Sequence, residues 1–150
     1  MSFFNMFSNR LFMCAVLGWF SAQVLKCLII VVRDKKVDLK RLLGSGGMPS
    51  SHTSFTVSLA TIMGLTFRFD SAEFALAATL ALIVMYDAAG IRQAAGKQAK
   101  ILNEIVELLM HGENPNVKLK ELLGHTGKEV FAGAILGIIV GVMMNGVFPA

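Results

Sequence analysis

The sequence predicts an all-α integral membrane protein: a helical bundle with about four transmembrane helices and an amphipathic helical segment on its cytoplasmic side. Its 150 residues are 55% hydrophobic and 16% charged, whereas soluble domains are roughly 45–50% apolar and 25% charged. A helix needs about 20 mostly apolar residues to cross a bilayer. The length suits one domain, residues 1–150. Four windows meet or nearly meet the length of a span: residues 11–32, 49–67, 72–89 and 130–148.

The first window is expected to be a retained helix rather than a cleaved signal peptide. Its apolar run is long, contains Lys26 and lacks a small-residue cleavage site before the basic connection that follows. Cys14 and Cys27 both lie on this helix. They would be about 20 Å apart at ~1.5 Å per residue, so we do not expect them to pair.

Local signals predict where the next helices begin and end. Pro49 suits the first turn of the second helix, where a missing N–H group costs nothing. Asp70 and Glu73 have the spacing of a capping box that would start the third helix. After Asp87 the third helix becomes amphipathic, so we expect it to leave the membrane. Its apolar residues recur at helical intervals: Ile91, Ala94, Ala95, Ile101, Leu102, Ile105, Leu108 and Leu109.

The connection to the last span contains one break and one short helix. "HGENPN" (residues 111–116) is predicted to end the third helix, because glycine, asparagine and proline favour turns. "VKLKELLGH" (residues 117–125) is predicted to form a short amphipathic helix, and "TGKEV" starts the last span.

Basic residues are concentrated in the first and third connections, which share one side of the membrane in a four-helix topology. By the positive-inside rule, this side is cytoplasmic and both termini face out. We therefore expect a multi-pass protein, in the bacterial inner membrane, whose site faces the cytoplasm. Nucleic acid is not an expected partner, because no aromatic residues interleave with the charges. Arg10 and Arg68 fall on the other side, and the cytoplasmic residues are Arg33, Lys35, Lys36, Lys40, Arg41, Arg92, Lys97, Lys100, Lys118, Lys120 and Lys128.

Lys26 is a charged residue inside the first apolar window, and Gln23 precedes it by three residues on the same helix face. A charge at the centre of a membrane costs on the order of 3 kcal/mol or more and usually marks a substrate path or an ion pair. Alternatively, the Lys26 side chain extends to the nearby cytoplasmic surface. The sequence favours neither interpretation over the other.

The stretch "GSGGMPSSH" (residues 44–52) precedes the second helix. A helix start offers unpaired N–H groups and the positive end of the helix dipole, which together bind anions such as phosphate. Ser50 and Ser51 would add hydroxyl donors, and His52 would stand beside the anion. The alternative is that one serine only caps the helix and that His52 has no chemical role.

"GHTGKEV" (residues 124–130) repeats this design at the start of the fourth helix. His125 and Glu129 have i,i+4 spacing, so the carboxylate would lie beside the imidazole, fix its tautomer and support a positive charge. Thr126 and Glu129 also have the spacing of a capping box, which would explain Glu129 without any chemistry. The local pattern leaves both interpretations open.

The combined pattern predicts one polar site at the cytoplasmic interface. His52 and His125 fall on the same side as Asp87 and Arg92, at the end of the third span. Arg92 offers a two-pronged donor to phosphate, or is simply a membrane anchor; a pair with Asp87 has five-residue spacing, which is not ideal in an α-helix. A nucleophilic histidine, a second histidine as acid, cations and a carboxylate make a phosphomonoesterase that needs no metal and no cofactor.

Four blocks in order resemble a known family. "AQVLK", "GGMPSSH", "DAAGIRQAAGKQA" and "LKELLGHTGKEVFAGAILG" look like the small divergent branch of the type-2 phosphatidic acid phosphatases, labelled acid phosphatase or vanadium-dependent haloperoxidase related. The resemblance runs from about residue 23 to 141. It implies a lipid phosphate substrate: phosphatidic acid, phosphatidylglycerophosphate, or an isoprenoid phosphate or diphosphate. The combination of residues by itself suggests a phosphohistidine intermediate, which would split the reaction into two easier steps.

In the wider superfamily, a motif ending in Arg-Pro precedes Pro-Ser-Gly-His, and Ser-Arg, five residues, His, three residues and Asp follow. Residues 49–52 match the second motif, with serine in place of glycine, so His52 would protonate the leaving oxygen and later activate water. His125 matches the nucleophile, and Glu129 replaces the Asp that orients it. No Arg-Pro precedes the second motif, and Leu119 stands where an arginine is expected.

Cations elsewhere in the chain are therefore assigned to the phosphate. The alternative function is a non-catalytic lipid-phosphate-binding protein, a transporter or an assembly factor. Two helices are missing relative to the usual six of the superfamily, so a homodimer could complete the fold. The expected site is catalytic at His125, His52 and Glu129, binds phosphate through Lys26, Ser50, Ser51 and Arg92, and is supported by Gln23 and Asp87.

Overall fold

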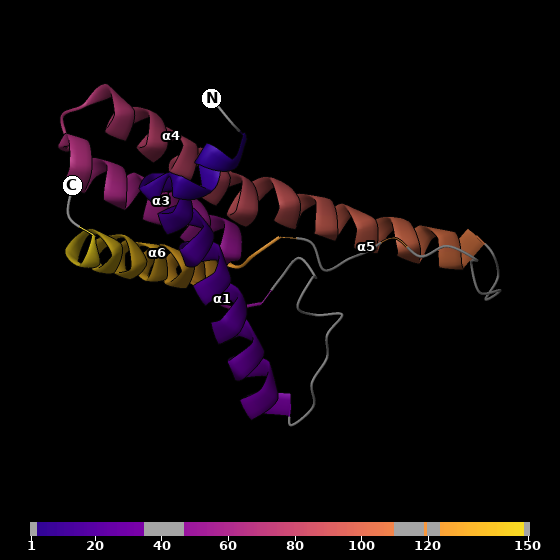
Figure 1. Cartoon of the computed structure of the whole chain (residues 1–150). Coiled ribbons are helices and arrows are strands. Elements are labelled where there is room, and N and C mark those ends of the chain that lie inside the picture. The colour runs from indigo at the N-terminus through magenta and orange to yellow at the C-terminus, as the bar shows by residue number, and fades with distance from the viewer. Residues whose placement is uncertain (1–2, 35–46, 110–118, 120–123, 149–150) are drawn as a thin grey trace.

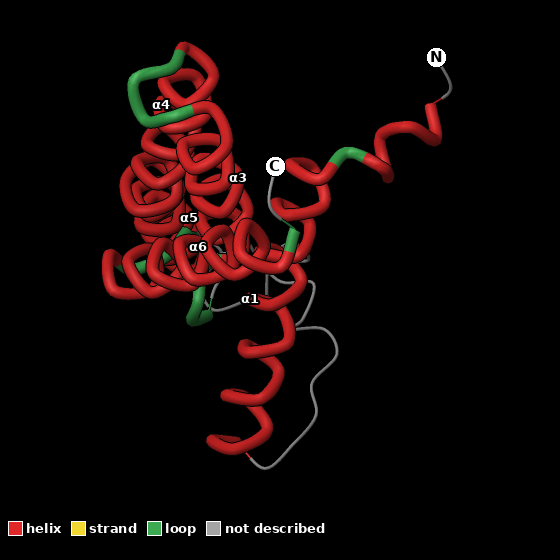
Figure 2. Tube along the Cα trace, turned by 60° about the vertical axis from the view of Figure 1, so that its left-hand side comes forward, coloured by secondary structure: helices red, strands yellow, loops and turns green. Residues whose placement is uncertain are grey.

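The computed structural model describes residues 3–34, 47–109, 119 and 124–148, and the described elements are all helical (Figures 1 and 2). A short 3₁₀ helix, η1 (Phe3–Ser8), precedes the first long helix. A π-helical turn, η2 (Asp87–Ile91), connects two helices that follow each other in one line. The α-helices are α1 (Arg10–Asp34), α3 (Ser51–Phe67), α4 (Ala72–Tyr86), α5 (Arg92–Leu109) and α6 (Gly127–Val147).

Helix α3 is the centre of the bundle, because it packs against α1, α4 and α6, while α1 also packs against α6. Two of its buried serines bond through their hydroxyl groups to the backbone of α1. Ser54 donates from Oγ to the carbonyl of Gly18 at 2.8 Å, and Ser58 donates to the carbonyl of Cys14 at 3.4 Å. In a membrane, such small polar residues let helices approach closely and keep hydroxyl groups paired.

Glycines on α6 let its backbone come close to α3. A Cβ atom added at Gly133 would lie 2.5 Å from the carbonyl oxygen of Ser50. At Gly137 it would lie 2.9 Å from the carbonyl oxygen of Ser54, and at Gly141 it would lie 2.7 Å from Cβ of Thr61. The i,i+4 repeat of glycine therefore forms one continuous contact between the two helices.

Two of the predicted helix starts are wrong in detail. Pro49 lies outside α3, just before the N-cap Ser50, rather than in the first turn. Asp70 does not cap α4. The cap is Ser71, whose hydroxyl accepts from the first turn, while Asp70 pairs with Nε of Arg68 at 3.1 Å. Ser71 is one residue closer than Asp70 to the free N–H groups of α4, and the Asp70 carboxylate pairs with the guanidinium of Arg68 instead.

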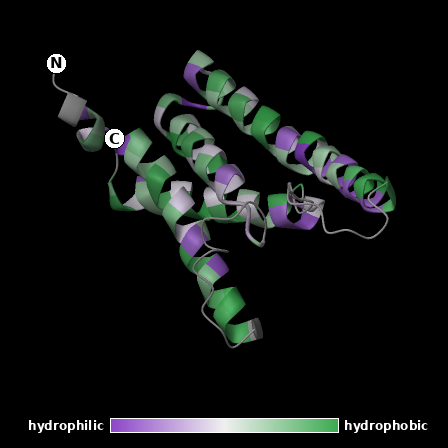
Figure 3. Ribbon diagram, turned by 90° about the vertical axis from the view of Figure 1, so that its right-hand side faces the viewer, coloured by the Kyte–Doolittle hydropathy of each residue, from purple (hydrophilic) through white to green (hydrophobic). Residues whose placement is uncertain are grey.

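The fold is an all-helical membrane bundle, as the sequence predicts. Three described segments are long and apolar enough to cross a membrane: Arg10–Val32, Ala72–Leu109 and Gly127–Val147. Helix α3 has 17 residues, about 25 Å at ~1.5 Å per residue, slightly less than a hydrocarbon core of roughly 30 Å. Hydrophobic residues run along much of the helices (Figure 3), and many of their large side chains are exposed, as contact with lipid requires.

Helix α5 continues the line of α4 and projects beyond the bundle (Figure 1). The helical segment Ala72–Leu109 has 38 residues, about 57 Å of helix and far more than a bilayer core needs. Its predicted extension past the span is therefore confirmed. Three predicted segments lie outside the described residues: the break at 111–116, the basic connection 35–46 and most of the short helix at 117–125. Of the short helix, the structure describes Leu119 and the last two residues. The backbone of Leu119 bonds to the side chain of Asn103 on α5.

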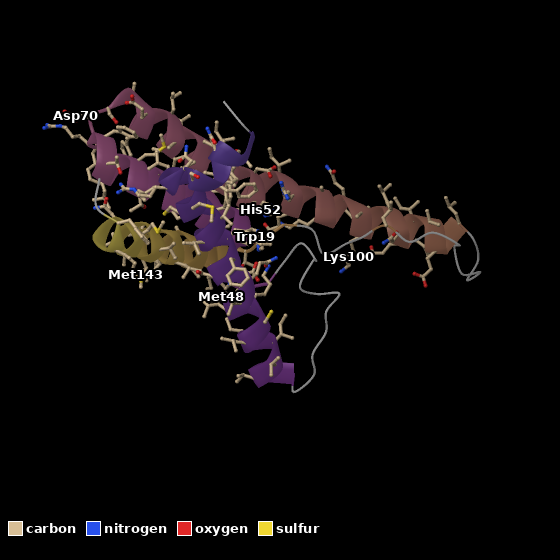
Figure 4. All side chains as sticks on the ribbon, in the orientation of Figure 1. Trp19, Met48, His52, Asp70, Lys100 and Met143 are labelled. Carbon is tan, nitrogen blue, oxygen red and sulfur yellow. The ribbon has the colours of Figure 1, made fainter. Side chains whose placement is uncertain are left out.

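The bundle has two chemically different ends. At one end, Arg10 at the start of α1 bonds to the carbonyl of Phe148, to Oγ1 of Thr66 at 2.7 Å and to Oδ1 of Asn145 at 3.4 Å. The starts of α3 and α6 therefore share the other end with the last turn of α4. Figure 4 shows His52 and Asp70 at opposite ends of α3.

The contact between α3 and α6 can be tested by placing a methyl group in it. Gly137→Ala should lower the free energy of unfolding by about 1–3 kcal/mol, because the added Cβ overlaps the backbone of α3. Gly146→Ala lies on the same helix with open space around it and should leave stability unchanged or slightly higher. Unfolding in mixed detergent micelles measures both, and equal stability of the two variants would contradict the packing described.

Candidate active site

The carboxylate of Glu129 makes both of the contacts that the sequence left as alternatives. Its Oε2 lies 3.2 Å from Nδ1 of His125 and accepts the backbone N–H of Thr126 at 2.9 Å. The hydroxyl of Thr126 in turn accepts the N–H of Glu129, completing a capping box. A carboxylate only accepts hydrogen bonds, so Nδ1 carries the hydrogen and the neutral ring keeps its lone pair on Nε2.

The imidazole of His125 is held in a buried position before the first turn of α6. Only 6% of the residue is exposed, and its N–H donates to the carbonyl of Ala88 at 2.9 Å. Burial is the main cause that lowers its pKa from the ordinary 6.5, and the charges of Lys26 and His52 act in the same direction. The hydrogen bond and charge of Glu129 oppose this shift. The ring is therefore neutral at neutral pH.

The start of α3 is tied directly to the start of α6. Ser50 is the N-cap, and its Oγ accepts from the N–H of Thr53 at 3.4 Å and from the Thr53 hydroxyl at 3.0 Å. Its own N–H donates to the carbonyl of Glu129 at 3.0 Å. The capping interpretation of Ser50 is therefore correct, and a hydroxyl has one hydrogen left for any other partner. Ser51 is also buried.

His52 occupies the first turn of α3 and is exposed at this end of the bundle (Figure 4). Electrostatic interactions link it to Arg92, Lys26 and Asp87, and they link it to His125 as well. The two histidines thus share one electrostatic environment at one end of the molecule, as their positions in the sequence predict.

Lys26 points into the bundle, so the alternative in which it extends to the membrane surface is wrong. Only 2% of the residue is exposed, and its methylene groups lie 3.6 Å from the position of a Cβ atom on Gly47. Its charge interacts with that of Glu129. Helix α1 turns this face toward the chain that leads into α3, which covers the side chain. Gln23 lies half-buried one turn earlier.

Asp87 and Arg92 form an ion pair, with Oδ2 and Nε 2.5 Å apart. The π-helical turn explains why the five-residue spacing works, because i,i+5 positions approach each other in a π-helix more closely than in an α-helix. Nε is engaged with Asp87, so a phosphate would meet the Nη groups of Arg92.

The predicted side chains therefore lie at one end of the bundle, where they come from α1, η2 and α5 and from the starts of α3 and α6. The sequence did not predict the role of Thr53, which bonds to the N-cap Ser50, or those of Ala88 and Gly124, which hold His125 in place. Among these three, only Gly124 could have been found from the sequence, because a glycine directly precedes the histidine. The described residues contain no cluster of three or more His, Cys, Asp or Glu able to hold a metal ion.

This geometry defines the class of the protein: an all-helical membrane bundle in which a buried histidine is held by a partly buried glutamate and interacts electrostatically with a second histidine. The sequence matches the divergent PAP2 family over residues 7–140, and the chain belongs to that family. The chain is 38% identical over 131 residues to the uncharacterized membrane protein YuiD of Bacillus subtilis. The matched region covers 79% of this chain and 83% of that protein. No solved structure shows a significant match. The resemblance predicted from the sequence is thereby confirmed.

The tautomer of His125 can be read from nitrogen chemical shifts. The chain has three histidines, so ¹⁵N-histidine labelling gives few signals, which His52→Asn and His111→Asn would assign. Near neutral pH, His125 should be neutral with its hydrogen on Nδ1. Glu129→Ala should abolish this preference, whereas Glu129→Gln keeps an acceptor and should preserve it. A wild-type ring with its hydrogen on Nε2 would contradict the assigned contact.

Proposed function

We propose that this protein is a metal-independent lipid phosphate phosphatase that works through a phosphohistidine on His125. The observation that supports this most is the contact of that ring: it is buried and held through Nδ1 by Glu129, which leaves the Nε2 lone pair available as a nucleophile. A second histidine and a buried lysine at the same end of the bundle supply the acid and the charge that phosphoryl transfer requires.

The reaction needs two displacements at phosphorus. In the first, Nε2 of His125 attacks the phosphorus, the bond to the lipid oxygen breaks, and His52 gives that oxygen a proton. In the second, His52 takes a proton from water, and the oxygen of that water attacks the phosphohistidine. Inorganic phosphate leaves and His125 is neutral again. Glu129 stabilises the positive ring that forms in between.

The substrate class follows from the charges and from the membrane. Lys26 on α1 and Arg92 on α5 would hold the phosphate oxygens, and the hydroxyl of Ser51 and the remaining hydrogen of Ser50 would complete the cradle. Apolar helices surround the cluster, so an acyl or isoprenoid chain can stay in lipid while its phosphate enters. Phosphatidic acid, phosphatidylglycerophosphate and isoprenoid phosphates or diphosphates all fit. The charge bias favours a cytoplasmic-facing site in a bacterial inner membrane.

Phosphate release from these lipids by purified protein in micelles, without added metal, tests the proposal. His125→Ala should lower kcat by at least about 10³-fold and His52→Ala by roughly 10²–10⁴-fold. His111→Ala is the matched control and should leave the rate unchanged. Acid-labile phosphate should accumulate on wild-type protein and be absent from the His125 variant. Release that survives both active-site substitutions would rule the mechanism out.

The pH profile tests the role of Glu129. The neutral His125 ring is the reactive form and burial lowers its pKa, so the acid limb of the kcat/KM profile should lie below pH 6.5. Glu129 raises this pKa against the effects of burial, Lys26 and His52. Glu129→Gln, which can keep the capping box, should therefore move the acid limb to still lower pH while reducing kcat. A limb that stays in place or moves upward would contradict this role.

The second candidate is a non-catalytic lipid-phosphate binder, such as a transporter or an assembly factor. Two observations favour it: Arg92 is already paired with Asp87, and the arginine of the superfamily motif is replaced by Leu119. Binding of radiolabelled phosphatidic acid that depends on Lys26 without any phosphate release would support this function instead.

A further inference from the structure

We propose that the π-helical turn η2 forms a backbone docking site, called the seat below, for the loop that carries His125. Gly124 is a positioning residue in that seat. The catalytic consequence rests on the proposed phosphatase function, whereas the seat itself does not. Single π-helical turns inside α-helices occur frequently at functional sites.

Gly124 lies against the backbone of η2 and of the first two residues of α5, at a distance that no side chain permits. Its φ is +86°, a conformation that glycine adopts far more easily than other residues. A Cβ atom there would lie 2.7 Å from N of Gln93, 2.9 Å from C of Arg92 and 3.1 Å from O of Ala88. Because these are backbone atoms, they cannot rotate out of the way.

The π geometry also frees the carbonyl group that receives His125. In an α-helix, the N–H of Arg92 would donate to the carbonyl four residues earlier, which is that of Ala88. Here it donates instead to the carbonyl of Asp87, five residues earlier. The Ala88 oxygen can therefore accept the N–H of His125 at 2.9 Å.

One turn thus positions two parts of the candidate site. Through its backbone it holds His125, and through the Asp87 carboxylate it directs Arg92. The distance between nucleophile and phosphate ligand is then fixed within a few residues of rigid helix. Misplacement of a reacting group by about 1 Å can cost on the order of 100-fold in rate, so the seat should matter for kcat more than for binding.

Three variants separate the seat from general stability. Gly124→Ala adds a methyl group that overlaps the turn. Gly124→Asn tolerates positive φ better but keeps the same overlap. Gly127→Ala, three residues on, has open space around the new methyl group and is the matched control. Two readouts apply to each variant in ¹⁵N-histidine-labelled protein: exchange of the His125 backbone N–H with solvent, and the kinetics of phosphate release.

The wild-type His125 N–H should exchange at least about 100-fold more slowly than in an unfolded peptide. Gly124→Ala and Gly124→Asn should both lose most of this protection and lower kcat about 10- to 100-fold, with KM within a few-fold of wild type. Gly127→Ala should match wild type in both readouts.

Fast exchange of this N–H in the wild-type protein would overturn the seat, and this measurement needs no variant to fold. Full recovery of kcat in Gly124→Asn would also overturn it, because only φ and not close contact would then matter. A protected N–H in a wild-type protein that releases no phosphate from any lipid would support the seat and would count against the proposed function alone.

Discussion

The close approach of α6 to α3 is the contact on which the rest of the structure depends. Gly133 lets the two backbones meet beside the carbonyl of Ser50. The N–H of Ser50 donates to the carbonyl of Glu129 at 3.0 Å. The starts of the two helices are therefore joined by their main chains. His52 follows on one helix, and His125 immediately precedes the other. A bulkier residue at the contact would separate them, whatever their own local geometry.

A second constraint is the burial of charge in a membrane protein. Lys26 is almost fully covered, which is costly unless an acidic group or a ligand compensates. The charge of Glu129 offsets part of that cost, while its carboxylate also completes the capping box of α6 and orients His125. One carboxylate thus connects helix stability, the tautomer of a candidate nucleophile and the tolerance of a buried cation. Under the proposed function, a phosphate held near Lys26 would compensate the charge further.

Membership of the divergent PAP2 family and the altered motifs fit together in this geometry. The motif arginines are absent, yet Lys26 and Arg92 come from helices α1 and α5 to the same end of the bundle. The histidines keep their positions at two helix starts, and a glutamate stands where the superfamily has an aspartate. The phosphate ligands that we propose are thus cations on helices other than those that carry the motifs, which is the central feature of the proposed function.

The sequence by itself determined what depends on neighbours along the chain. Hydrophobic length fixed the helices, and i,i+4 and i,i+3 spacing fixed the contacts of Glu129 with His125 and Thr126, because helical geometry is local. The sequence alone did not decide whether Lys26 points inward, whether Ser71 or Asp70 caps α4, or whether Asp87 can pair with Arg92 through a π-helical turn. The position of Lys26 depends on which helix faces meet, because only long-range packing separates its alternatives. The cap of α4 and the Asp87–Arg92 pair depend on competing local contacts, such as the pairing of Asp70 with Arg68. The convergence of the two histidines was predictable as a shared membrane side, but the bonds that fix it, from Ser50 to Glu129 and from His125 to Ala88, required the tertiary structure.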